Sequence, residues 1–151
     1  MRDKRLGVLF VCTGNICRSP TAEAVFRKLV ADAGMSEAIL TDSAGTHGYH
    51  VGEPPDDRTQ RHAKQRGYDL SAQRARHLSQ RDFEEFDLVL AMDRGHLRIL
   101  QRLCPPQHAG KVRLLLQEAD VPDPYYGGPE GFEQVLDLVE AACRSLLTEI
   151  R

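Results

Sequence analysis

The sequence lacks several features that would assign it to common functional classes. It contains no Gly-Lys followed by Ser or Thr, the signature of a nucleotide-binding phosphate loop, so nucleotide hydrolysis is disfavoured. Positive and negative charges nearly cancel, with a formal net charge of −2 over 151 residues. Because no global positive field is present, we expect no nucleic-acid partner.

Long apolar runs and abundant cysteines are also missing. The apolar run over residues 6–11 is too short for a signal peptide, and nothing approaches the length of a membrane span. Four cysteines are too few for a secreted disulfide scaffold of this length. We therefore expect a cytoplasmic protein with no membrane partner, whose cysteines are mostly reduced. The length suits a single domain over residues 1–151, and no repeat or linker divides it.

Apolar strand-like runs alternate with amphipathic helical patterns along the whole chain. Strands are predicted over residues 6–11, 39–44, 88–92 and 112–116, and helices over 19–33, 57–66, 79–85, 94–103 and 131 to the C-terminus. This alternation predicts an α/β fold whose mostly parallel sheet has helices on both faces. Ligands of such sheets bind at the carboxyl ends of the strands, so the loop after the first strand is the predicted site.

The loop after the first strand has the composition of an anion-binding site. Residues 11–20 read VCTGNICRSP, with Cys12 at the end of the strand and a helical pattern following directly. N–H groups and the dipole of a helix N-terminus stabilise a thiolate and hold an oxyanion such as phosphate. Arg18 can grip that anion through two parallel hydrogen bonds. Gly14 and Asn15 are residue types that permit the left-handed turn such a loop needs.

Ser19 suits both a structural and a chemical role. It is a preferred helix cap, and its hydroxyl can also hydrogen-bond a neighbouring thiolate. The alternative interpretation is a capped strand–turn–helix with a buried cysteine. We favour the chemical interpretation because every element of the loop also serves it.

A proton donor is needed if a thiolate expels the leaving group of a phosphate ester. Asp123 is the best candidate, because it follows the fourth predicted strand and therefore lies at the same edge of the sheet. Burial beside aromatic rings would favour its protonated form. The alternative is an ordinary turn, since Pro, Asp and Gly dominate turns and Asp123 is flanked by prolines.

Four segments, in order along nearly the whole chain, resemble the low-molecular-weight protein tyrosine phosphatase family. They are residues 11–20, 42–46 (DSAGT), 86–93 (FDLVLAMD) and 123–126 (DPYY). The resemblance implies a compact three-layer α/β fold of the Rossmann/flavodoxin-like kind, with a four-stranded parallel sheet. It also implies metal-free, cofactor-free hydrolysis of phosphotyrosine, in a protein or a small aryl phosphate, through a cysteinyl-phosphate.

The resemblance also implies roles for individual residues. Cys12 corresponds to the nucleophile, Arg18 to the phosphate clamp, and Asp123 to the acid that protonates the phenol and then activates water. The anion cradle corresponds to the backbone of Thr13, Gly14, Asn15, Ile16, Cys17 and Arg18. The residues that support the loop and the thiolate correspond to Asn15, Ser19, Ser43 and Gln73. Gln73 is a departure, because it stands where the family often has a histidine bonded to the loop asparagine, and a glutamine can donate the same bond.

Other residues keep two interpretations open. The resemblance implies that Cys17 is a redox partner that forms a disulfide with Cys12, and the alternative is a small apolar filler. Tyr49 and Tyr125 are expected to wall the substrate pocket with Ile16 at its mouth, or else to pack within their loops. Asp93 is expected to cap the next helix rather than pair with Arg18.

Histidines and the basic segment suggest no further chemistry. His47 and His50 lack other ligands in the sequence, so we expect no metal site. His62, His96 and His108 are expected at the surface. Residues 73–77 (QRARH) are expected to form a solvated loop, with steering of anionic substrates as the alternative.

Alternative functions on the same scaffold remain open. Relatives that act on protein phosphoarginine tend to have Thr at the position of Ile16. An isoleucine there favours a substrate with a flat aromatic ring, such as phosphotyrosine. A thiol-dependent arsenate reductase would need further cysteines after the third strand, where Cys104 stands alone. A non-catalytic phosphate-binding module is disfavoured because nucleophile, clamp and acid are all present. We expect a monomer or a weak dimer.

Overall fold

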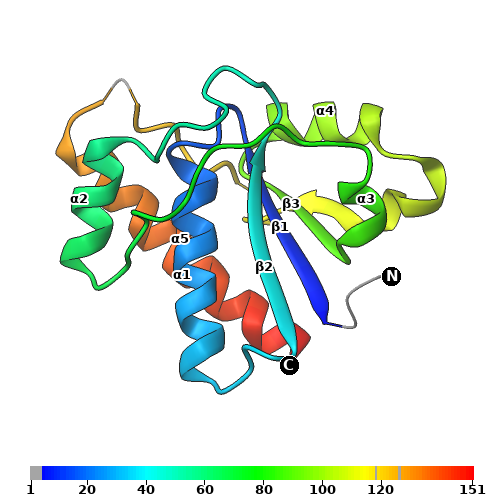
Figure 1. Ribbon diagram of the computed structural model, residues 1–151, viewed down its shortest axis with the longest axis horizontal. Coiled ribbons are helices and arrows are strands. Elements are labelled where there is room, and N and C mark those ends of the chain that lie inside the picture. The colour runs from blue at the N-terminus through cyan, green and yellow to red at the C-terminus, as the bar shows by residue number, and fades with distance from the viewer. Residues whose placement is uncertain (1–4, 118, 126) are drawn as a thin grey trace.

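The computed structural model describes residues 5–117, 119–125 and 127–151 (Figure 1). The strands are β1 (Leu6–Cys12), β2 (Ile39–Gly45), β3 (Leu88–Ala91) and β4 (Val112–Leu114). The helices are α1 (Arg18–Asp32), α2 (Asp57–Gln65), α3 (Asp82–Glu85), α4 (Arg94–Leu103), the 3-10 helix η1 (Pro106–Lys111) and α5 (Pro129–Ile150). All pairings are parallel, in the order β2-β1-β3-β4. The predicted fold class is confirmed.

Two apolar layers cover the sheet, as Figure 1 shows. α1 and α5 pack on one face, where Val8 and Phe10 of β1 point into the larger core cluster. α3 and α4 lie on the other face, which receives Leu9 and Val11. Successive residues of a strand point to opposite faces, so a continuous apolar run such as residues 6–11 indicates a strand buried on both sides.

Element boundaries differ from the prediction where local signals are weak. β4 ends at Leu114, two residues earlier than expected, and η1 was not predicted. α3 is one short turn that begins at Asp82 rather than Ser79. The Ser79 N–H donates to the Asp82 carboxylate at 2.8 Å, which is one of the two hydrogen bonds of a capping box.

The carboxyl ends of the strands meet at one edge of the sheet and place the candidate site there. Cys12 and Gly45 end β1 and β2 as register partners. Asp93 follows β3, and the segment that carries Asp123 follows β4. Among the described residues, no helix is long and apolar enough to cross a membrane.

Candidate active site

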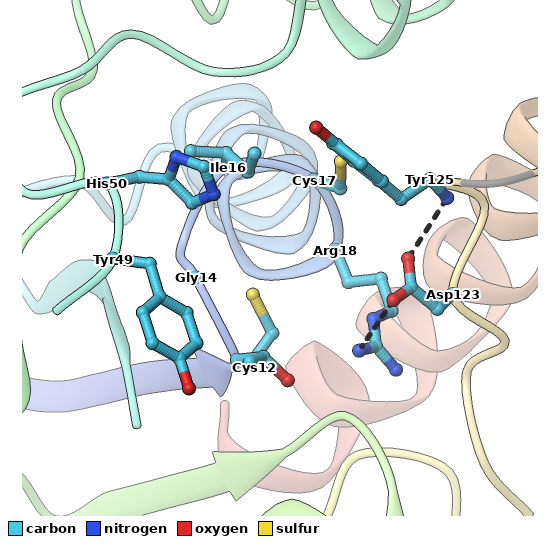
Figure 2. Close-up of a pocket in the computed structure, with 10 residues that line it drawn as sticks. Cys12, Gly14, Ile16, Cys17, Arg18, Tyr49, His50, Asp123 and Tyr125 are labelled. Atoms are coloured by element: carbon cyan, nitrogen blue, oxygen red, sulfur yellow. Dashed lines mark hydrogen bonds and ion pairs between the residues drawn. The ribbon is translucent and has the colours of Figure 1, made fainter. Parts of the chain in front are cut away.

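The loop from β1 to α1 forms the floor of a pocket of about 230 Å³ (Figure 2). The lining residues are Cys12, Thr13, Gly14, Ile16, Cys17, Arg18, Tyr49, His50, Asp123 and Tyr125. Cys12 ends β1, and α1 begins at Arg18, so the loop lies at the N-terminus of a 15-residue helix. This arrangement provides backbone donors and a positive helix end for a bound oxyanion.

Asn15 is the residue that gives the loop its left-handed turn. Its φ is 60°, and among the described non-glycine residues it is the one with a positive φ. The expectation that Gly14 also takes this conformation is wrong, because Gly14 is absent from the positive-φ glycines. Gly14 instead allows close approach of a side chain: a Cβ there would stand 2.8 Å from the His50 ring in its present position.

Gly45 makes a second close approach that the sequence did not indicate. A Cβ on Gly45 would lie 2.7 Å from the Thr13 carbonyl oxygen and 3.0 Å from that of His47. Both contacts are to backbone, so neither can yield by rotating a side chain. The end of β2 therefore packs directly under the loop and fixes its height above the sheet.

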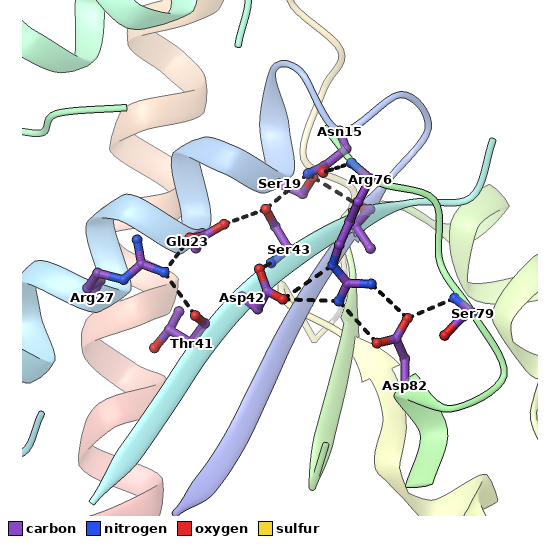
Figure 3. A network of polar contacts seen from close by, with 11 residues as sticks. Asn15, Ser19, Glu23, Arg27, Thr41, Asp42, Ser43, Arg76, Ser79 and Asp82 are labelled. Carbon is purple, nitrogen blue, oxygen red and sulfur yellow. Dashed lines mark hydrogen bonds and ion pairs between the residues drawn. The ribbon is translucent and has the colours of Figure 1, made fainter. Parts of the chain in front are cut away.

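A chain of buried polar groups holds the loop from below (Figure 3). The Asn15 amide donates to the hydroxyls of Ser19 at 2.8 Å and Ser43 at 3.0 Å. The Ser19 hydroxyl lies 2.9 Å from the Cys12 sulfur, and Ser43 donates onward to Glu23. Burial raises the pKa of Glu23, although the bond from Ser43 and the charge of Arg27 oppose this. The network ties the cysteine to α1 and β2 together.

Arg76 completes this network, and sequence reasoning missed it. Its backbone N–H donates to the Asn15 amide oxygen at 3.0 Å. Its guanidinium binds Asp82 through two hydrogen bonds of 3.0 and 3.1 Å and pairs with Asp42. The expectation of a purely solvated loop over residues 73–77 is wrong for Arg76, which anchors the loop asparagine. No local pattern marked its bond to Asn15, because the two residues are 61 positions apart and the donor is a backbone N–H.

Arg18 is buried and aimed into the pocket by its partners. Its guanidinium donates to Asp93 at 2.8 Å and to the Val121 carbonyl at 3.0 Å, and it lies 3.7 Å from the Asp123 carboxylate. Asp93 performs both roles considered for it, since its other oxygen accepts the His96 N–H and caps α4. Burial alone would raise the pKa of Asp93, but the His96 N–H and Arg18 together lower it.

His96 is buried rather than exposed, which corrects the sequence expectation. Its side chain faces the loop and shares a hydrogen bond of 2.7 Å with the Thr13 hydroxyl. Burial, reinforced by the charge of Arg18, lowers the pKa of His96 to about 4. The ring is therefore neutral at pH 7 and links α4 to the loop without adding charge.

Asp123 lies across the pocket from the loop, close to Arg18 (Figure 2). One carboxylate oxygen accepts the Tyr125 N–H at 3.0 Å. Arg58 of α2 supports this segment, because it donates to the Tyr125 carbonyl at 2.8 Å and lies over the Tyr125 ring. The expectation of a buried carboxyl is wrong, since the Asp123 side chain is 48% exposed.

Comparison with known proteins decides which family shares this arrangement. The family model described as "Low molecular weight phosphotyrosine protein phosphatase" matches residues 7–151. The chain belongs to this family.

Individual relatives agree over nearly their full lengths. The "Low molecular weight protein-tyrosine-phosphatase" of Streptomyces coelicolor is 52% identical, covering 95% of this chain and 93% of that protein. The human "Low molecular weight phosphotyrosine protein phosphatase" is 44% identical, covering 93% and 92%. A crystal structure of the protein tyrosine phosphatase from Entamoeba histolytica superposes with a TM-score of 0.92 at 40% identity, covering 96% of each chain.

Gln73 does not make the contact that the family resemblance suggested. Its amide nitrogen donates to the Pro20 carbonyl at 3.2 Å, and the bond to Asn15 comes from the Arg76 backbone instead. Gln73 therefore ties residues 73–77 to the first turn of α1. In this member of the family, a backbone N–H supplies a donor to the loop asparagine.

The aromatic side chains stand at the rim of the pocket. Tyr49 is 71% exposed and stacks on His47 with ring centroids 5.0 Å apart. Tyr125 is half-buried on the opposite side, and Ile16 lies between them in Figure 2. Tyr126 of the same motif lies outside the described residues. His50 pairs with Glu53 at 2.7 Å, and the described residues contain no group of three or more metal-ligating side chains.

Both cysteines of the loop are reduced and buried. Burial, with a smaller effect from the charge of Asp56, raises the pKa of Cys17 to about 12, although a hydrogen bond with Thr59 opposes this shift. The Cys17 thiol is therefore protonated at neutral pH. Cys104 lies at the end of α4 and does not line the pocket.

Proposed function

We propose that this protein hydrolyses phosphotyrosine, in proteins or in small aryl phosphates, through a cysteinyl-phosphate intermediate. The observation that carries the proposal is the convergence of Cys12, Arg18 and Asp123 on one pocket whose floor is a helix-capped loop. Membership of the phosphatase family supports the same reaction. The geometry of these three side chains supports one role for each of them.

In the first step, the phosphate dianion lies on the N–H groups of residues 13–18 and against the Arg18 guanidinium. The Cys12 thiolate attacks phosphorus, so an S–P bond forms as the P–O bond to the phenol breaks. Asp123 donates a proton to the departing oxygen, which then leaves as a neutral phenol. The buried guanidinium and backbone donors are fixed before reaction, so they stabilise transition-state charge with little reorganisation.

In the second step, water attacks the phosphorus of the cysteinyl-phosphate. Asp123, now ionised, takes a proton from that water, and the S–P bond breaks to release inorganic phosphate. The sulfur returns to its thiolate form beside the Ser19 hydroxyl. Splitting the hydrolysis into two displacements lets one carboxyl serve as acid and then as base.

The pocket wall favours an aromatic substrate over the two alternatives. Tyr49, Tyr125 and Ile16 present flat or apolar surfaces around the phosphate position, which suit a phenyl ring. A disulfide relay for arsenate reduction is disfavoured, because Cys104 is remote from the pocket lining. Phosphoarginine, which is polar and charged, gains less from the same apolar contacts.

A substrate panel tests this proposal. We expect initial rates on a phosphotyrosine peptide to exceed those on matched phosphoarginine and phosphoserine peptides by at least roughly tenfold, as expected when one substrate alone fills an apolar pocket. Arsenate reduction is measured alongside with a thiol reductant. A higher rate on either other phosphopeptide, or dominant arsenate reduction, would overturn the assignment.

Cys17 is proposed as a redox partner of Cys12. A peroxide would oxidise the Cys12 thiolate to a sulfenic acid, and the Cys17 sulfur would then displace water to form a disulfide. The protonated state of Cys17 predicts that this second step is slow at neutral pH and faster in alkaline buffer. Peptide mass spectrometry after mild peroxide treatment decides the matter, since absence of a Cys12–Cys17 linkage at both pH values excludes the role.

We also propose a cytoplasmic location and a monomer or weak dimer. The proposed nucleophile Cys12 must stay reduced for turnover, which a reducing compartment favours. Light scattering on the purified chain over a concentration series tests the assembly state.

A further inference from the structure

We propose that a basic groove along α4 docks an acidic segment of the substrate protein beside its phosphotyrosine. This inference rests on the proposed function, because the groove acts on whichever phosphoprotein the pocket accepts. The groove is open, measures about 720 Å³, and is separate from the phosphate pocket except at one shared residue, Thr13. A chain whose phosphotyrosine fills the pocket can therefore extend into the groove.

The groove is built from the start of α4 and one face of that helix. Its lining includes Thr13, Asp93, His96, Arg98, Ile99 and Arg102. His96 is buried on the inner side of the helix, whereas Arg98 and Arg102 are exposed. Because residues four apart lie on the same face of a helix, the two guanidiniums border one side of the groove together.

Among the described residues, no acidic side chain neutralises the charge of Arg98 or Arg102. In the described part of the chain neither arginine forms an ion pair, whereas neighbouring Arg94 pairs with Asp120 at 3.5 Å. The carboxylate in the groove, Asp93, is already bound to Arg18 and to the His96 N–H. Two free cations thus lie beside a pocket for an anionic substrate, which favours a negatively charged partner segment.

The spacing of the arginines matches an extended peptide. Measured along the helix axis from Asp93, Arg98 and Arg102 lie about 8 and 14 Å away, and about 6 Å from each other. Alternate residues of an extended chain are about 6.6 Å apart and point to the same side. With the phosphotyrosine backbone level with Asp93, acidic residues at its second and fourth neighbours would meet the two guanidiniums.

The experiment measures kcat/KM on four phosphotyrosine peptides. Two carry Glu at the second and fourth positions, either before or after the phosphotyrosine, and two carry Gln at the same positions. For the wild-type chain we expect a roughly three- to tenfold preference for Glu over Gln on one side, the range for two partly exposed ion pairs. The preference should shrink as salt is raised from about 50 to 300 mM, because exposed ion pairs are screened.

Two double variants separate the groove from general charge effects. Arg98→Ala with Arg102→Ala should reduce the preference to within about 1.5-fold, while turnover of a small aryl phosphate is retained. Arg61→Ala with Lys64→Ala removes the same charge from exposed positions on α2, at the other end of the molecule from α4 in Figure 1. This control should keep the preference.

Each outcome bears on a different claim. Equal kcat/KM on Glu and Gln peptides by the wild-type chain, with normal aryl phosphate turnover, overturns the groove and leaves the proposed function standing. A preference that survives the α4 variant, or that falls equally in the α2 variant, also overturns it. Failure of the wild-type chain to hydrolyse any aryl phosphate would instead defeat the proposed function.

Discussion

Cys12→Ser abolishes turnover of aryl phosphates, by at least roughly 10⁴-fold, and leaves phosphate binding nearly intact. Loss of a nucleophile removes the covalent route altogether, and such losses are among the largest that single substitutions cause. The anion cradle survives, because it consists of backbone N–H groups and the buried Arg18 guanidinium, which Asp93 and Val121 hold in place. Steady-state rates and calorimetric titration with inorganic phosphate measure the two properties separately.

A matched control and a direct chemical assay make this expectation decisive. Cys104→Ser makes the same exchange of sulfur for oxygen at a half-exposed site outside the pocket, so its turnover should stay within twofold of wild type. Rapid quenching with a ³²P-labelled aryl phosphate should place label on the wild-type chain at Cys12 and none on Cys12→Ser. Full turnover by the serine variant, or label at another residue, would refute the proposed nucleophile.

The parts of the site that lie close together in the sequence could be predicted from it. Cys12 and Arg18 are separated by five residues between a strand run and a helix pattern, so their chemistry was visible in one short segment. The parallel sheet followed from the alternation of apolar runs, which then placed Asp123 at the same edge. The hydrogen bonds and ion pairs that position Cys12, Arg18 and Asp123 could be identified only from the tertiary structure.

The missed residues all act across long separations in the chain. Arg76 reaches Asn15, 61 positions away, through its backbone N–H, which no side-chain pattern encodes. Gly45 has no room for a side chain because the Thr13 carbonyl of the loop lies directly over it. His96 contacts the loop because its position on α4 directs the side chain toward Thr13. Arg58 similarly supports the Asp123 segment from α2. In each case the residue type was unremarkable, and the packing of two elements gave it a role.

The sequence motif correctly predicted a left-handed turn in the loop, but it did not identify which residue has the positive φ. Both Gly14 and Asn15 tolerate a positive φ, so composition alone could not separate them. In the structure Asn15 has the positive φ, and its side-chain amide makes three hydrogen bonds in that conformation. Gly14 does not have a positive φ, and the His50 ring packs closely against it. A side chain that can be satisfied by its neighbours offsets the cost of the left-handed backbone.

Asp123→Asn should lower kcat for phosphotyrosine roughly 10²- to 10⁴-fold, because the amide neither protonates the departing phenol nor takes a proton from water. The substitution preserves size and can still accept the Tyr125 N–H, so the segment should keep its place over the pocket. The extent to which the variant slows the first step should depend on the leaving group. A nitrophenolate departs readily without a proton, so formation of the cysteinyl-phosphate from that substrate should be slowed much less than from phosphotyrosine.

Pre-steady-state kinetics distinguish this role from simple misfolding or weakened binding. With a nitrophenyl phosphate, the variant should show a burst of phenol followed by slow turnover, because the second step still lacks its base. Asp120→Asn is the control, since Asp120 is exposed, lies three residues earlier and binds the Arg94 backbone at 3.0 Å. It should leave both the burst and the steady state within twofold of wild type. Equal losses in the rate of the first step for good and poor leaving groups would contradict proton donation by Asp123, because a structural defect would slow that step alike for both substrates.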